Sequence, residues 1–169
     1  MLNLAKSKAL QYFNLMDSFG KLIAVDYGVK RVGLAICNLE TQIVFPLCTL
    51  DRTVKKIFFE NFSNIIAEHK PTALVLGLPL HEDGSPCITT NQVKNFAASL
   101  ARRYPLPIYL MEELLSSFEA EENMRSMGVN AKKIKKHVDQ EAAVLILESF
   151  LTAPRKNLYQ PEQDFSKNK

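Results

Sequence analysis

Cysteine is scarce in this sequence, and the three cysteines fit neither a crosslinking nor a zinc-binding pattern. Cys37, Cys48 and Cys87 are odd in number, lack C-x-x-C spacing and have no neighbouring pair of histidines. A disulfide scaffold and a structural zinc site are therefore not expected. The chain is predicted to work in a reducing, cytoplasmic compartment.

A long hydrophobic run is also absent. No stretch approaches the roughly 20 apolar residues that are needed to span a bilayer. The N-terminal segment Met1–Lys8 mixes charged and apolar residues and lacks the uninterrupted apolar region of a secretory signal. We therefore expect no membrane partner.

The sequence has little net charge. With 21 Lys and Arg against 18 Asp and Glu, the formal net charge is +3, so attraction to phosphate would have to come from local clusters. Hydrophobic residues make up 47% of the 169 residues, which is typical of one globular domain with a substantial core. Because no G-x-G-x-x-G opens a helix, Gly28, Gly33 and Gly84 are expected in turns or close packing.

Predicted strands and helices follow one another in an α/β order. Apolar runs at 21–26, 31–37 and 42–49 have connections too short for a crossover helix, which predicts an antiparallel meander. Residue spacing then predicts, in order, helix 51–70 with Asp51 as N-cap, strand 72–78, helix 91–103 and strand 107–111. Because helix crossovers join parallel strands, the predicted product is a five-stranded mixed sheet flanked by helices.

Two further helices and two terminal segments complete the predicted chain. Ser116 and Glu119 fit a capping box that opens a helix ending at Gly128, and the last helix is expected over about 139–152. Residues 1–20 are interpreted as an N-terminal extension of unknown role. Residues 153–169 are interpreted as a flexible tail, which leaves 21–152 as the domain.

Acidic residues are predicted to meet at one edge of this sheet. Asp26 closes the first apolar run, and Glu112 and Glu113 follow the run that ends at Met111. The carboxyl ends of these two strands share an edge, which is where α/β sheets usually bind ligands. Asp139 prolongs the apolar stripe of the last helix, which continues through Ala142, Ala143, Ile146 and Phe150. Such an oxygen-rich group favours Mg²⁺ or Mn²⁺, and two such ions support phosphodiester cleavage.

Each candidate residue also has a simpler explanation. Asp26 suits a turn, Asp139 suits a helix N-cap and Glu113 suits a solvated loop. Since most carboxylates are not catalytic, the shared position of the acids supports the hypothesis more than any one of them does. His69 and His81 are weaker candidates for a general base, because the sequence shows no orienting partner for either.

Four strings of this sequence resemble the YqgF family. They are D-Y-G-V-K-R-V-G from Asp26, G-L-P-L-H-E-D-G from Gly77, E-E-L-L-S-S-F-E-A from Glu112 and V-D-Q-E-A-A from Val138. Four motifs in this order across residues 21–152 are far more specific than a lone D-x-G. The family comprises pre-16S rRNA nucleases and Holliday-junction-resolvase-like proteins with an RNase H-like fold.

The resemblance implies a function and assigns residues to it. Asp26, Glu113 and Asp139 match the family's acids, so they are expected to bind Mg²⁺ or Mn²⁺ and to catalyse cleavage at the 5′ end of pre-16S rRNA. A DNA junction is the alternative substrate. Two departures bear on this expectation, since Glu112 replaces the usual Asp and Leu114 stands where the family commonly has Arg. The loss of that Arg removes a partner for phosphate or carboxylate.

Basic residues lie beside two of the proposed acids. Lys30 and Arg31 follow Asp26, and a segment expected to be a loop before Asp139 contains Lys132, Lys133, Lys135 and Lys136. These residues are predicted to hold a phosphate backbone, with strong salt dependence. The simpler explanation of the lysines is a solubilising loop.

Two functions of other classes remain open from the sequence. Leu114 favours a noncatalytic RNA-binding or ribosome-assembly module. An actin-like ATP-binding protein would share the D-x-G turn, but that fold normally duplicates the domain and 169 residues leave no room for a second copy. The sequence allows a monomer or a homodimer, and junction cutting would favour a two-fold dimer.

Overall fold

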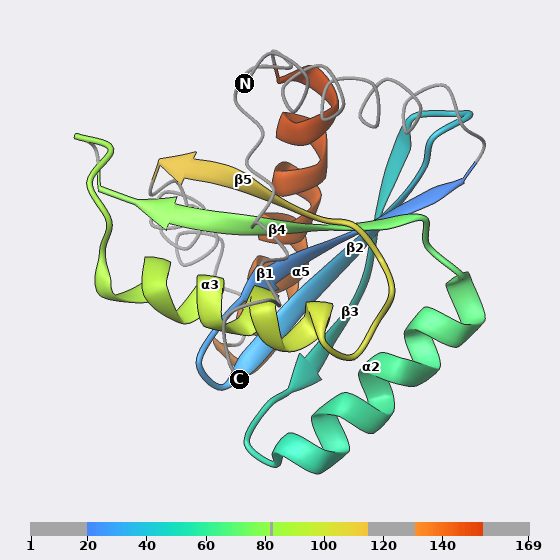
Figure 1. Ribbon diagram of the computed structural model, residues 1–169, viewed down its shortest axis with the longest axis horizontal. Helices are drawn as coiled ribbons and strands as arrows, with labels where there is room; N and C mark the ends of the chain where they lie inside the picture. Colours follow the sequence, from blue (N-terminus) through green and yellow to red (C-terminus); the bar gives the residue numbers. More distant parts are fainter. Residues whose placement is uncertain (1–19, 82, 115–130, 154–169) are drawn as a thin grey trace, which may run out of the picture.

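A five-stranded mixed sheet forms the centre of the computed structural model, which describes residues 20–81, 83–114 and 131–153 (Figure 1). The strands are β1 (Lys21–Tyr27), β2 (Arg31–Asn38), β3 (Ile43–Asp51), β4 (Ala73–Leu80) and β5 (Ile108–Leu114). They lie in the order β3-β2-β1-β4-β5. The first three pair antiparallel, and β4 and β5 continue the sheet parallel to β1. This arrangement is the predicted five-stranded mixed sheet, an antiparallel meander continued by parallel strands.

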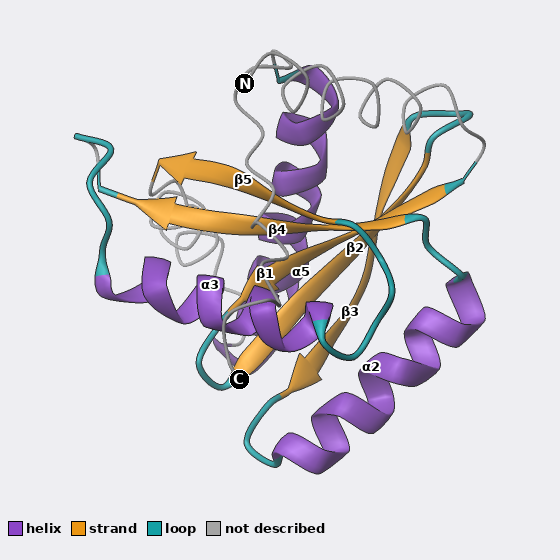
Figure 2. Cartoon of the chain, viewed as in Figure 1, coloured by secondary structure: helices purple, strands orange, loops and turns teal. Residues whose placement is uncertain are grey.

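Helices cover both faces of the sheet (Figure 2). One face packs against α2 (Lys55–His69) and α3 (Ile88–Ala101), and the other packs against α5 (Ala131–Thr152). Alternate residues of β1 divide between the two cores, with Ile23 and Val25 in the first and Leu22 and Ala24 in the second. By the same alternation, Asp26 lies on the face that α5 covers.

The start of α2 differs from the sequence prediction. Its N-cap is Val54 rather than Asp51, which is the last residue of β3. The Asp51 carboxylate instead accepts a hydrogen bond from the Thr53 N–H at 2.7 Å, so it stabilises the turn before the helix. The helix ends at Lys70, whose left-handed backbone (φ 48°) lets its N–H donate to the Ile66 carbonyl.

The last helix is longer than predicted, since α5 begins at Ala131 rather than near residue 139. The proposed loop of Lys132, Lys133, Lys135 and Lys136 is therefore wrong, because these residues have helical backbone. Asp139 is likewise not an N-cap and lies two turns into the helix. The helix predicted from Ser116 to Gly128 and the terminal segments 1–19 and 154–169 lie outside the described residues.

None of the helices in the described part of the chain is long and apolar enough to cross a membrane. The longest is α5, with 22 residues. It carries charged side chains such as Glu141 and Glu148, which are exposed as the helical spacing predicts. Among the side chains of α5 that the structure describes, the buried ones are Val138, Ala143, Ile146, Leu147 and Phe150.

A single glycine sets how closely α5 approaches the sheet. A Cβ built on Gly33 would lie 1.9 Å from the carbonyl oxygen of Asp139 and 2.3 Å from its carbonyl carbon. Both atoms belong to backbone, so no side-chain rotation could relieve the overlap. Gly33 is thus a close-packing glycine, one of the two roles predicted for it.

We expect Gly33→Ala to destabilise the fold by at least about 2–3 kcal/mol, since the new methyl group forces α5 off the sheet. Urea unfolding followed by circular dichroism measures the loss. Gly84→Ala is the matched control, because Gly84 has φ +78° but no atom lies within 4 Å of the point that its Cβ would occupy. Its expected cost is about 1 kcal/mol, from backbone strain alone. Equal losses in the two variants would contradict the close packing at Gly33.

Candidate functional site: an acidic pair beneath the last helix

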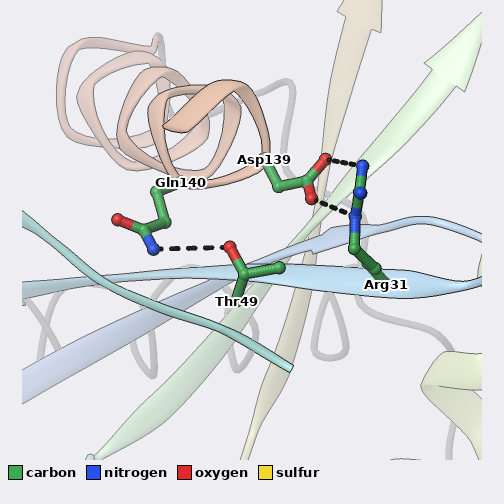
Figure 3. Close-up of polar contacts among 4 residues, drawn as sticks. All are labelled: Arg31, Thr49, Asp139 and Gln140. Atoms are coloured by element: carbon green, nitrogen blue, oxygen red, sulfur yellow. Dashed lines mark hydrogen bonds and ion pairs between the residues drawn. The ribbon is translucent and has the colours of Figure 1, made fainter. Parts of the chain in front are cut away.

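Three side-by-side residues of the sheet support α5 at Asp139 and Gln140. Thr49 of β3 pairs with Gly33 of β2, and Gly33 pairs with Asp26 of β1. Above this row, Asp139 rests its backbone on Gly33, and the Gln140 Nε2 donates a hydrogen bond to the Thr49 Oγ1 at 3.4 Å (Figure 3). The row therefore fixes Asp139 beside Asp26, although 113 residues separate them in sequence.

The two carboxylates are electrostatically coupled. Burial raises the pKa of Asp26 from 3.8 to about 7, and the nearby charge of Asp139 contributes in the same direction. Both causes disfavour the ionised form of Asp26. A positive charge close to Asp26 would favour its ionised form, and a bound cation could supply that charge.

Arg31 supplies part of that positive charge. Its Nε donates to the Asp139 Oδ2 at 2.7 Å, and its Nη2 lies 3.5 Å from the Oδ1 (Figure 3). The side chains are 35% and 19% exposed, so the ion pair is only partly screened by water. Sequence reasoning assigned Arg31 to nucleic acid and did not foresee this contact, which joins residues 108 positions apart.

Arg52 holds the turn that follows Asp26. Its Nη1 donates to the Gly28 carbonyl at 2.8 Å, and its backbone N–H donates to the Lys30 carbonyl at 2.8 Å. Its guanidinium also lies over the rings of Tyr27 and Phe96, 4.4 and 5.0 Å from their centroids. Sequence reasoning missed Arg52, because none of these partners is near enough in sequence to give a pattern.

The two glutamates of β5 lie at alternating positions. Leu110 belongs to the core under α2 and α3, whereas Tyr109 belongs to the core under α5. Glu112 is two residues after Leu110, so its side chain is on the same face of the strand as Leu110. It is exposed and projects away from the face that carries Asp26. The expectation that the glutamates follow the strand was wrong, because β5 extends to Leu114.

Glu113 can be placed only by its backbone. It pairs with Pro79 of β4, and its side chain and that of Leu114 lie outside the described residues. Among the side chains that are described, no three of His, Cys, Asp or Glu gather as a metal site. The described part of the site is therefore the pair Asp26 and Asp139, with Arg31.

The remaining predicted residues are more peripheral. Lys30 is exposed in the turn after β1, and the side chains of Lys132, Lys133, Lys135 and Lys136 lie outside the described residues. His69 ends α2, on the opposite face of the sheet from Asp139, so it is separated from the acids. His81 is exposed in the loop after β4, where its N–H donates to the Ser85 carbonyl.

The comparison with known protein families agrees with the extent of this fold. The family model for RuvX, described as a Holliday junction resolvase, matches residues 20–153. The chain belongs to the RuvX family. This confirms the YqgF resemblance, since RuvX and YqgF are two names for one family.

Curated RuvX relatives match most of the chain. One from Nitratidesulfovibrio vulgaris strain Miyazaki F is 44% identical over 134 residues, which cover 79% of this chain and 94% of the relative. One from Rickettsia africae is 38% identical over 141 residues, 83% of this chain and 92% of the relative. Both carry the name "Putative pre-16S rRNA nuclease". A solved RuvC from T. thermophilus, in complex with Holliday junction substrate, is 10% identical over 79% of this chain and 96% of that one, with a TM-score of 0.47. That similarity is too weak to support an inference.

We expect Arg52→Ala to speed hydrogen exchange of the Gly28 amide, which donates to the Arg31 carbonyl at 2.9 Å, by at least about tenfold. The reason is that the turn loses the guanidinium that anchors its carbonyls. NMR exchange measures the rate. Arg103→Ala is the matched control, because that guanidinium also covers a ring, Phe59 at 3.9 Å, but donates to Ser99. Equal rates in the two variants would show that the turn does not depend on Arg52.

The raised pKa of Asp26 predicts a pH dependence of stability. Between about pH 4 and 7 the folded chain binds the proton more tightly than the unfolded chain, so the free energy of unfolding without metal falls as pH rises through this window. We expect Asp26→Asn to be more stable than the parent at pH 7.5 in EDTA, by on the order of a few kcal/mol. The difference should vanish below about pH 4.

Urea unfolding across this pH range tests the expectation. Asp83→Asn is the control, because hydrogen bonds from Ser85 lower the pKa of the exposed Asp83. Replacing Asp83 should therefore not stabilise the protein at pH 7.5. A parent whose stability rises from pH 4 to 7, with no gain in Asp26→Asn, would contradict the raised pKa.

Proposed function

We propose that this protein is a cytoplasmic, metal-dependent nuclease that cleaves structured RNA at the 5′ region of pre-16S rRNA. Membership of the RuvX family and the names of the curated relatives support the reaction and the substrate. The observation that carries the proposal is the pair of Asp26 and Asp139, which lie together on the α5 face and repel each other. At neutral pH and above, such a pair is costly to the fold unless Asp26 is protonated or a cation binds the pair.

The chemistry of the pair fits Mg²⁺ or Mn²⁺. Hard divalent ions prefer carboxylate oxygens, and neither Asp26 nor Asp139 has a thiol or imidazole among the partners described above. We assign Asp26 and Asp139 as ligands and Glu113 as the third. Glu113 follows Tyr109 and Met111 at two-residue intervals in β5, and both of these side chains pack on the α5 side. The opposite parity of Glu112 favours Glu113 over its neighbour.

The ion would supply Lewis acidity, which lowers the pKa of water and offsets charge on the phosphate. The chain's own residues prepare the site for it. Asp26 titrates near neutral pH without metal, so binding would release its proton from the carboxylate. Arg31, which contacts Asp139, is assigned to hold a phosphate oxygen, and the exposed Lys30 next to it in sequence is assigned to the flanking backbone.

The lysines of α5 provide a further phosphate contact in this proposal. The helix begins at Ala131, so its first two turns contain Lys132, Lys133, Lys135 and Lys136. The macrodipole is positive at that end, so lysines there are unfavourable on their own and become favourable beside a polyanion. A contact of this kind predicts that binding weakens steeply with salt.

A DNA junction is the second candidate substrate. The description of the matching family as a Holliday junction resolvase favours it. A four-way junction approaches two-fold symmetry, so a junction-cutting enzyme would act as a homodimer, whereas an RNA-end nuclease could act as a monomer. Substrate and oligomeric state are therefore tested together.

Cleavage assays on labelled pre-16S rRNA 5′ fragments and four-way DNA, with Mn²⁺, Mg²⁺ or EDTA, test the function. We expect metal-dependent cleavage of the RNA and a loss of at least about 100-fold in Asp26→Asn and Asp139→Asn, since each removes a ligand. Glu141→Gln, an exposed change on the same helix as Asp139, should keep full activity.

The results separate the alternatives. Cleavage of the junction but not of the RNA would show that the substrate is a DNA junction. RNA binding without turnover in either metal would support a noncatalytic assembly module. Activity that survives in Asp26→Asn would refute the assigned site, and misfolding could not hide this result, because that variant is expected to be more stable than the parent at neutral pH.

A further inference from the structure

Arg31 occupies the same carboxylate that the proposed metal needs. Its Nε donates to the Asp139 Oδ2 at 2.7 Å, and its Nη2 reaches toward the Oδ1 at 3.5 Å. The guanidinium therefore faces both oxygens of Asp139 (Figure 3). A divalent ion shared by Asp26 and Asp139 would have to approach these oxygens too, against the positive charge of Arg31.

The position of Arg31 allows it to leave. It is the first residue of β2, and its side chain is 35% exposed, so a rotated guanidinium reaches solvent without opening the core. Its cross-strand partner is Asp51, an exposed residue whose charge already acts on Arg31. A partly exposed ion pair contributes little to stability, so a divalent cation held by two carboxylates can displace it.

We propose that Arg31 is an exchangeable counter-ion of Asp139, which the divalent ion displaces and which then binds a phosphate of the substrate. This inference rests on the proposed nuclease function and adds to it a coupling between metal binding and substrate binding. A phosphate that takes Arg31 away from Asp139 removes a competitor of the metal, so substrate and metal tighten each other's binding. By reciprocity, the factor is the same in both directions.

Mn²⁺ titration followed by electron paramagnetic resonance tests the exchange without relying on activity. Arg31→Gln removes the charge but keeps a hydrogen-bond donor of similar reach. We expect it to bind Mn²⁺ about tenfold more tightly than the parent, the effect of removing one positive charge roughly 6 Å from a divalent ion in a water-like dielectric. Lys94→Gln makes the same charge change on an exposed residue of α3, on the opposite face of the sheet, and should alter the affinity less than about twofold.

The outcomes distinguish the exchange from the proposed function. Equal or weaker Mn²⁺ binding by Arg31→Gln, with clear binding by the parent, would overturn the exchange and leave the metal site standing. No Mn²⁺ binding by the parent or by Arg31→Gln would overturn both. Binding by Arg31→Gln alone would support the exchange, since the competitor would then be the obstacle.

A second measurement uses the parent protein and does not depend on the variant's folding. The Nε–H of Arg31, held at 2.7 Å by Asp139, should give a protected resonance in ¹⁵N-labelled protein. Saturating Mg²⁺ should shift this resonance or abolish its protection, as the guanidinium leaves. An unchanged Arg31 resonance at saturating Mg²⁺ would overturn the proposal.

Discussion

The contact between Gly33 and the backbone of Asp139 is the constraint on which the site depends. A helix that crosses a sheet normally stands off by the thickness of the intervening side chains. Here a residue without a side chain lets the helix touch the strand, and the register then places Asp26 next to the contact point. The relative position of the two carboxylates is thus set by the packing of α5 on β2 and not by an interaction between the carboxylates themselves.

This arrangement places two carboxylates close together, and the repulsion between their ionised forms is relieved by protonation of Asp26 or by a cation. Burial raises the pKa of Asp26, and the charge of Asp139, which helix packing brings close, adds to the effect. The fold tolerates the pair because its two cores, one on each face, hold the sheet and helix in place. Arg31 and Arg52 then order the turn between β1 and β2 from opposite faces, one through a carboxylate and the other through carbonyls and rings.

Much of the fold could be predicted from the sequence because strand and helix periodicities are local properties. The meander, the parallel strands and the inward face of the last helix all follow from spacing of two or 3.6 residues. The early start of α5 was missed, although Ile134 and Val138 continue its stripe at four-residue intervals. The ion pair of Arg31 and the contacts of Arg52 could not be predicted, since they join groups 108 and 24 residues apart and depend on side-chain rotamers.

The distribution of the site along the chain has a consequence for synthesis. Asp26, Arg31, Gly33 and Thr49 lie within one meander that a growing chain completes early, whereas Asp139 arrives with the last described helix. Chains emerge from the ribosome N-terminus first, at roughly 5–20 residues per second. A nascent copy therefore carries the sheet for several seconds before it can assemble the acidic pair. Any activity of that pair is confined to chains that have been translated past Asp139, and a product truncated before α5 would keep the five strands without the pair.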